Sequence, residues 1–335
     1  MNERKPTEVC ITVDTEFSIG GNFDDPLLTP VAEPIVLGAV GGKEHGLGFL
    51  LDSLCEFDVR ATFFVEALQT AYFGAEPMGG VARRIAGAGH DVQLHLHPCW
   101  MHYSAAPDGS PKGIPSDSCA GRTDADLDQL FRSGLAAFSR WKVPRPVAVR
   151  TGNFQVDINF YQAAARAGVL LSSSVAVAVE RPLDHRLWLA GGCHRFGSVT
   201  ELPVVSYSYA VGRNARLRLL SITACSVAEI VSVLRQARQR AISPVIILTH
   251  PQEFIKHTDF RYTKLRPNRV NQDRFRGLLK FLKRNKQDFV VRPIVDIKET
   301  DPRNTQYRDP SITVSSFKAI ARMVENGIND RIWWY

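Results

Sequence analysis

Two histidines, His95 and His97, stand two residues apart in the segment GHDVQLHLHPCW at positions 89–100, directly before Pro98. Side chains at positions i and i+2 of an extended segment lie on the same face. Both imidazoles can therefore approach one point in space, and imidazole is a common ligand of zinc and similar cations. The pattern indicates a metal site; a buried, hydrogen-bonded histidine pair without metal is the alternative interpretation.

A second pair with the same spacing, Asp14 and Glu16, lies where an apolar run meets a glycine-containing segment. These two carboxylates can also converge. Arg150, in VAVRTGNF, and His250, in VIILTHPQEF, end two further apolar runs. In parallel α/β sheets, functional residues gather beyond the carboxyl ends of the strands. Residues capable of chemistry at four predicted strand ends therefore indicate one active site.

Arg150 and His250 would complete a hydrolase site. We expect Arg150 to pair with a carboxylate, orienting it and keeping it ionised. His250 emerges from an almost wholly apolar run and is followed by Pro251, which ends the strand. We therefore expect the His250 side chain at the mouth of the sheet rather than in the core.

The elements that must position these residues follow an alternating pattern. Short apolar runs alternate with segments of helical periodicity, which is typical of a mostly parallel sheet with helical crossovers, in a barrel-like or doubly wound α/β fold. Apolar repeats at three and four residues predict helices around 47–54, 127–138, 230–234 and 275–282. The predicted strands, expected to be buried on both faces, are 8–14, 60–65, 90–96, 146–150, 169–174, 200–205, 244–249 and 288–292.

Stretches rich in Gly and Pro at 18–46 and 103–122 are predicted to be long loops, and such loops are often functional. The chain after about residue 300 has the composition of a linker, followed by a predicted helix near 314–326 and an aromatic end. The predicted organisation is one catalytic domain over 1–298 and a C-terminal linker and helix over 299–335.

Length and composition place the chain in a broad class. With 335 residues and 44% hydrophobic content, it can bury the core of one large domain. The charged N-terminal segment lacks the apolar core of a signal peptide, and no run of 18 apolar residues occurs, so we expect a cytoplasmic protein without a transmembrane segment. The six cysteines form no C-x-x-C pair, and we expect reduced thiols, with Cys10 and Cys55 buried in apolar stretches.

The net charge of +7 comes from one segment, 256–292, which carries twelve Lys or Arg against three Asp or Glu. A solvated helix face and loop is the favoured interpretation. The segment has no RNA-binding aromatic signature and no recognisable DNA-reading helix, so no specific nucleic-acid partner is expected. A substrate carrying phosphate, contacted by Lys264 and Arg266, is the alternative.

Taken together, the motifs resemble those of the polysaccharide deacetylases with NodB homology, carbohydrate esterase family four, from about residue 8 to about residue 295. TVDTE at 12–16 stands where the family has its aspartate motif, and GHDVQLHLHP resembles the histidine motif. RTGNF resembles the arginine motif, and ILTH the final histidine motif. The order of these segments along the chain is as specific as the motifs themselves. The resemblance implies a distorted parallel (β/α) barrel of the glycoside hydrolase/deacetylase type.

The resemblance also implies roles for individual residues. Asp14 would be the general base, oriented by Arg150, and His250 the general acid that protonates the leaving amine. His95 would be a metal ligand. The implied cofactor is a divalent metal, expected to be zinc, which acidifies bound water and polarises an amide carbonyl.

This chain departs from the family pattern at three positions. Thr15 replaces the usual second aspartate, so we expect Glu16 to supply the carboxylate ligand. Cys99 occupies the position of the usual second histidine, so we expect His97 to replace that ligand, with a Cys99 thiolate as the alternative. Ser172 stands where relatives often have an aspartate that supports the arginine. The chain thus resembles a divergent branch with Asp-x-Glu and His-x-His-Pro signatures.

The resulting hypothesis is a metal-dependent hydrolase that removes an N-acyl group, expected to be N-acetyl, from an amino sugar in a glycan or glycan precursor. Peripheral contact with a lipid-linked substrate is compatible with it. The alternatives are hydrolysis of a non-sugar linear or cyclic amide, and an inactive carbohydrate-binding or assembly protein of the same fold. The oligomeric state is left open.

Overall fold

The computed structural model describes residues 5–103, 116–211, 214–297, 306–308 and 311–331. Its centre is a parallel sheet with the strand order β13 (Val245–Thr249), β1 (Thr7–Thr15), β4 (Thr62–Glu66), β5 (Asp91–Leu96), β6 (Ala148–Thr151), β7 (Leu171–Ser172) and β10 (Val199–Glu201). Two further strands extend this sheet: β16 (Phe289–Val291) pairs with β1, and β9 (His194–Phe196) pairs antiparallel with β10.

The sheet curls into a distorted, barrel-like arrangement. After β10 the chain continues to Val204, which forms a parallel bridge with Ile246 of β13. The first and last parallel strands are thereby joined, and the predicted α/β barrel is confirmed. All eight predicted strands are present, but the expected burial on both faces does not hold for β16, where Val290 and Val291 are partly exposed.

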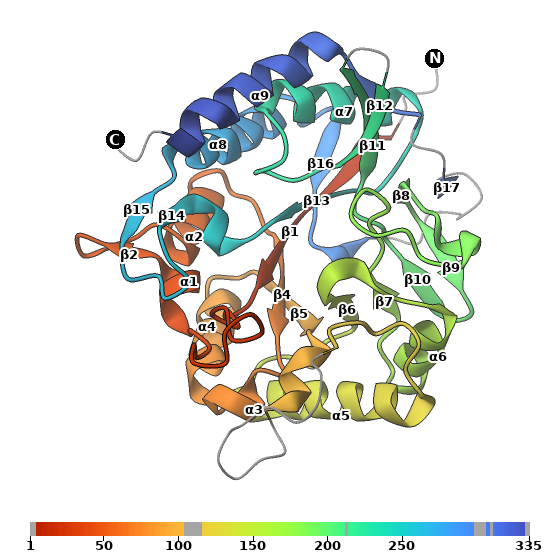
Figure 1. Ribbon diagram of the computed structural model, residues 1–335. Helices are drawn as coiled ribbons and strands as arrows, with labels where there is room; N and C mark the ends of the chain where they lie inside the picture. The colour runs from red at the N-terminus through yellow and green to blue at the C-terminus, as the bar shows by residue number, and fades with distance from the viewer. Residues whose placement is uncertain (1–4, 104–115, 212–213, 298–305, 309–310, 332–335) are drawn as a thin grey trace.

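Helices surround the strands on their outer side (Figure 1). The longer ones are α2 (Leu47–Glu56), α4 (Glu76–Gly87), α5 (Asp124–Trp141), α6 (Ile158–Arg166), α7 (Val227–Gln239) and α8 (Arg269–Arg284). The four helices predicted from apolar repeats are confirmed as α2, α5, α7 and α8. Helices α4 and α6 were not predicted, since small residues such as Ala82 and Ala163 occupy much of their buried faces.

The barrel interior holds a small core of its own, separate from the large core between strands and helices. Cys10, Phe64 and Ile246 belong to this inner cluster and are fully buried. The six cysteines, all within the described residues, form no disulfide, as predicted. Burial raises the pKa of the Cys10 thiol, in keeping with the predicted inert sulfur. The prediction for Cys55 was wrong: its side chain is exposed, because it lies on the outer face of α2.

The stretch 18–46 is more structured than predicted. It contains α1 (Glu33–Leu37) and a hairpin of β2 (Ala39–Val40) and β3 (Lys43–Glu44). A second short hairpin, β14 (Ile255–His257) and β15 (Leu265–Pro267), packs beside β2. A further short helix, α3 (Thr70–Phe73), follows β4. Of the other predicted loop, 103–122, residues 104–115 lie outside the described residues.

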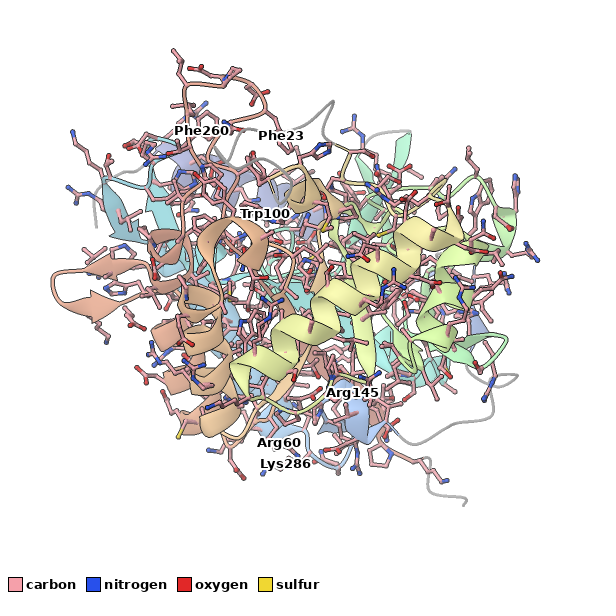
Figure 2. The ribbon with its side chains drawn as sticks, turned by 90° about the horizontal axis from the view of Figure 1, so that it is seen from below. Phe23, Arg60, Trp100, Arg145, Phe260 and Lys286 are labelled. Carbon is pink, nitrogen blue, oxygen red and sulfur yellow. The ribbon has the colours of Figure 1, made fainter. Side chains whose placement is uncertain are left out.

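The two ends of the barrel can be told apart by the residues that precede and follow its strands. In Figure 2, Arg60, Arg145 and Lys286, which precede strands, lie at one end, while Trp100, which follows a strand, lies toward the other. Phe23 and Phe260 project beyond that second end. This is the end at which the carboxyl termini of the parallel strands meet, where an active site is expected.

The C-terminal segment packs against the barrel through three elements. β17 (Gln306–Tyr307) pairs with β8 (Gly191–Gly192), and β18 (Thr313–Val314) pairs with β11 (Ser206–Val211) of the hairpin that β12 (Asn214–Leu219) completes. Helix α9 (Ser316–Arg331), predicted near 314–326, lies on α7 and β11. The predicted domain boundary at 298/299 lies outside the described residues. Among the described residues, no helix is long and apolar enough to cross a bilayer.

A buried ion pair joins α9 to α7 and provides a test of this packing. The Nε of Arg322 lies 3.1 Å from the carboxylate of Glu229, and both side chains are almost completely buried. Arg322→Leu should lower the free energy of unfolding by about 3 kcal/mol, because it leaves the Glu229 charge buried without its partner. Urea denaturation measures this loss. The matched control is Arg331→Leu on the exposed side of α9, and equal stabilities of the two variants would contradict the prediction.

Candidate metal centre and active site

The structure brings the two predicted residue pairs together. Asp14 lies in β1 and Glu16 follows its end, while His95 lies in β5 and His97 follows its end. Strand β4 separates β1 from β5 in the barrel, and its last residue, Glu66, is in register with His95. The carboxyl ends of β1 and β5, on either side of β4, therefore direct these side chains to one place.

Glu16 contacts both histidines. Its Oε2 lies 3.1 Å from the Nε2 of His95 and 2.6 Å from the Nε2 of His97. One oxygen or nitrogen atom from each residue could hold the same metal ion. Asp14, in contrast, contacts Arg150 and faces His250. Glu16, rather than Asp14, is thus the carboxylate beside the two imidazoles.

The hydrogen bonds at the other ring nitrogens fit a metal ligand role. The Nδ1 of His95 lies 2.9 Å from the carbonyl oxygen of Arg150, and that of His97 lies 2.6 Å from the Oδ2 of Asp117. Because both oxygens can only accept, each Nδ1 carries the hydrogen and donates it. In the neutral rings, each Nε2 then keeps a lone pair directed at Glu16. Two nitrogens and a carboxylate facing one another form the donor set of a His₂Glu zinc site.

The negative charges of Glu16 and Asp117 favour a positive charge beside the two histidines. Burial alone would raise the pKa of Glu16, but His97 and His95 hold it well below its usual range. Burial alone would lower the pKa of His97, but the charges of Glu16 and Asp117 raise it well above its usual range. Without a cation, a proton on His97 supplies this charge. A divalent cation bound by Glu16, His95 and His97 would supply this charge instead.

Cys99 lies on the other side of His97. Together with His97 and Asp117 it forms a second group that could hold a metal ion. Burial raises the pKa of the Cys99 thiol to about 12, which disfavours the thiolate required of a ligand. Because Glu16 contacts both imidazoles and Cys99 is grouped with His97 but not with His95, Glu16 is favoured over Cys99 as the third ligand of the histidine pair.

Arg150 makes the predicted contact with a carboxylate. Its Nη1 donates to the Oδ1 of Asp14 at 2.6 Å and to the Oγ1 of Thr12 at 2.9 Å, and its side chain is fully buried. The guanidinium also donates to Ser173, at 2.9 Å to the carbonyl oxygen and 2.7 Å to the hydroxyl. Ser173 thus supports Arg150, whereas the hydroxyl of Ser172 bonds to a neighbouring serine instead.

His250 lies at the mouth of the barrel, directly after β13. Its Nε2 faces the Oδ2 of Asp14 at 3.9 Å, and its Nδ1 lies 3.0 Å from the Oε1 of Glu253. Burial opposes protonation, but the hydrogen bond and charge of Glu253, with the charges of Asp14 and Glu16, raise the pKa of His250 to about 9. The ring at neutral pH is therefore protonated and presents a hydrogen at Nε2.

Sequence reasoning missed three residues that shape the site. Glu253 follows His250 by three residues within one turn, a local spacing that could have revealed it. Asp117 lies within the predicted loop 103–122, but no spacing links it to His97. Glu66 is fully buried and accepts the backbone N–H of His97 at 3.2 Å, and burial raises its pKa to about 8.

The charge of Glu253 predicts a pH effect. A general acid must be protonated, so activity should fall as the pH rises through the pKa of His250, about 9. Glu253→Gln removes the charge that raises this pKa, and the alkaline limb of kcat/KM should move to lower pH. A pH–rate profile measures the limb, with Glu56→Gln on the exposed surface as the control. An unshifted limb in Glu253→Gln would exclude His250 as the group that titrates there.

Comparison with known proteins finds similar solved structures but no matching family model or curated protein. No protein-family model matches the chain, and no curated protein matches it. Among solved structures, a protein from Mycobacterium smegmatis assigned to the polysaccharide deacetylases is 17% identical, with a TM-score of 0.47, over 88% of this chain and 90% of its own. A family 4 carbohydrate esterase from Streptomyces lividans in complex with acetate is 13% identical, with a TM-score of 0.43, over 92% and 100%.

A pseudoenzyme of the same family, from Bacillus anthracis, is 11% identical, with a TM-score of 0.44, over 87% of this chain and 65% of its own. The solved structures similar to this chain thus include members of the family that its motifs resemble, among them a pseudoenzyme. At these identities and TM-scores, the similarity does not establish an activity. The evidence for a function is therefore the geometry of the site itself.

Proposed function

We propose that this chain is a metal-dependent amide hydrolase that removes an N-acyl group, in the first instance N-acetyl, from an amino sugar. The observation that carries the proposal is the position of Glu16, His95 and His97 beside two hydrogen-bonded pairs, Asp14–Arg150 and His250–Glu253. A binding protein has no need of a metal-ligand set, an oriented carboxylate and a protonated imidazole in one place.

The metal would be held by Glu16, His95 and His97. When bound, zinc or a similar divalent cation supplies Lewis acidity to the amide carbonyl and to water. The donor set is the one that hydrolytic zinc sites use, which favours zinc over magnesium or calcium.

The protein's own groups would move the protons. Arg150 holds the Oδ1 of Asp14, so the Oδ2 is the oxygen directed toward His250 and is placed to accept a proton from the attacking water. As the C–N bond breaks, His250 donates the hydrogen at its Nε2 to the leaving nitrogen. Amide and water then become carboxylic acid and amine, with one proton taken up by Asp14 and one given by His250.

The substrate class is the finer part of the proposal. Lys264 and Arg266 line a groove together with Tyr262 and Glu33. The side chain of Tyr262 is hydrogen-bonded to that of Ser18, which lies two residues after Glu16. A substrate that carries an anionic group could extend from the metal site along this groove. Since Glu33 offsets part of the positive charge, a neutral sugar fits equally. The cytoplasmic location expected from the N-terminal sequence stays a prediction.

The test is the release of acetate or free amine by zinc-loaded protein and by metal-free protein. N-acetylated amino-sugar oligomers, phosphorylated N-acetyl sugars and simple linear or cyclic amides form the substrate panel. Release from the sugars only with metal would support the proposal, and release from the simple amides alone would replace the sugar with a non-sugar substrate. No release from any compound by fully metal-loaded protein would overturn it in favour of an inactive binding protein.

A further inference from the structure

The two histidines of the candidate metal centre are held in different ways. The Nδ1 of His95 donates to the main-chain carbonyl of Arg150, an atom fixed by the pairing of β5 with β6. The Nδ1 of His97 donates instead to the side chain of Asp117, twenty residues further along the chain. His97 also lies beyond the end of β5, where the hydrogen bonds between neighbouring strands no longer constrain it. Its ring orientation therefore depends on side chains.

Asp117 is itself held at both oxygens. Its Oδ2 accepts from the Nδ2 of Asn153 at 2.7 Å, in addition to His97, and its Oδ1 accepts from the backbone N–H of Cys99 at 3.2 Å. Asn153 adopts a left-handed backbone conformation with φ of 57°, which Asn tolerates better than most residues. Donors from two separate segments thus converge on one carboxylate.

Gly152 completes the enclosure of the His97 ring. A Cβ atom at this position would lie 2.2 Å from the Nδ1 and the Cε1 of His97. The ring therefore packs directly on the main chain that follows β6. Contacts at Gly152, at Asp117 and at Glu16 leave the imidazole one orientation, with Nε2 directed at Glu16.

We infer that Asp117 is a positioning residue that fixes the tautomer and orientation of His97, and thereby sets the affinity of the Glu16–His95–His97 group for its cation. The inference rests on the proposed metal site. Carboxylates that accept from the second ring nitrogen of a metal-bound histidine commonly change metal affinity by ten- to a hundredfold when removed. No comparable substitution exists for His95, because its partner is main chain.

Asparagine cannot replace this carboxylate. The donors to this carboxylate require an acceptor at both Oδ atoms, and the side-chain amide introduced by Asp117→Asn would present an NH₂ group to at least one of them. If that group met the Nδ1 of His97, the ring hydrogen would move to Nε2 and block the lone pair meant for the metal. Asp117→Asn should therefore weaken binding about as much as Asp117→Ala.

The experiment is a zinc competition titration of the full chain against a chromophoric chelator, for wild type, Asp117→Asn, Asp117→Ala and the exposed control Asp52→Asn. We expect zinc affinity to fall by about ten- to a hundredfold in both Asp117 variants and to be unchanged in Asp52→Asn. Nitrogen-15 NMR of the zinc-loaded wild type should show the Nδ1 of His97 protonated. The unfolding midpoint of the metal-free proteins reports any purely structural loss.

The outcomes separate the two proposals. Equal zinc affinity in wild type and both Asp117 variants would overturn the role of Asp117 while leaving the metal-dependent function intact. A fall in zinc affinity matched by the same loss of metal-free stability would make Asp117 a structural residue, and would also overturn the inference. No zinc binding by the wild type would remove the proposed function, and the inference with it.

Discussion

Purified protein carrying His95→Ala and His97→Ala is expected to contain almost no divalent metal, whereas the wild type holds close to one equivalent. The double variant removes two of the three ligands, and Glu16 alone cannot retain a zinc ion against buffer. Elemental analysis after incubation with zinc measures the difference, and hydrolytic activity should be lost with the metal.

The matched control replaces two other histidines, His45→Ala with His185→Ala, neither of which belongs to the group around Glu16. Equal metal in the site variant and the control would place the metal elsewhere in the chain. No metal in the wild type, even after incubation with zinc, cobalt or nickel, would remove the hydrolytic mechanism and favour the binding-protein alternative.

Asp14→Asn should lower kcat by about a thousandfold while the protein keeps its metal, because the amide cannot accept a proton from water. Asp14 contacts Arg150 and His250 rather than the histidine pair, so its loss separates proton transfer from metal binding. Steady-state kinetics and elemental analysis on the same sample give both readouts.

Thr12→Val is the control for this substitution, since it removes another hydrogen bond of Arg150 but leaves the carboxylate in place. We expect it to retain most of the activity. If Asp14→Asn lost its metal along with its activity, Asp14 would be a ligand rather than a base. Comparable kcat losses in both variants would assign the effect to displaced Arg150.

Much of the fold followed from local patterns in the chain. Apolar runs such as 244–249 and helical repeats such as 127–138 require burial on a sheet whatever the rest of the chain does, and they became β13 and α5. The short pairings β8–β17 and β11–β18 were not predicted, because they join segments about a hundred residues apart through two residues each. No local periodicity marks such pairs.

The sequence by itself determined which residues could meet. The i and i+2 spacings of Asp14 with Glu16 and of His95 with His97, each at the end of an apolar strand, place these side chains at one edge of a parallel sheet. This inference needs only the alternation of side chains along a strand. The register of β1, β4, β5 and β6 then brought the edges together.

Only the tertiary structure decided which contacts these side chains make. Glu16 faces the imidazoles and Asp14 faces Arg150, because Glu16 lies beyond the end of β1 while Asp14 is still held in the barrel wall beside the arginine. Ser173 rather than Ser172 supports that arginine, and Asp117 reaches His97 from a separate segment. These contacts depend on strand register and loop path, which arise from packing of the whole barrel and leave no mark in residue spacing.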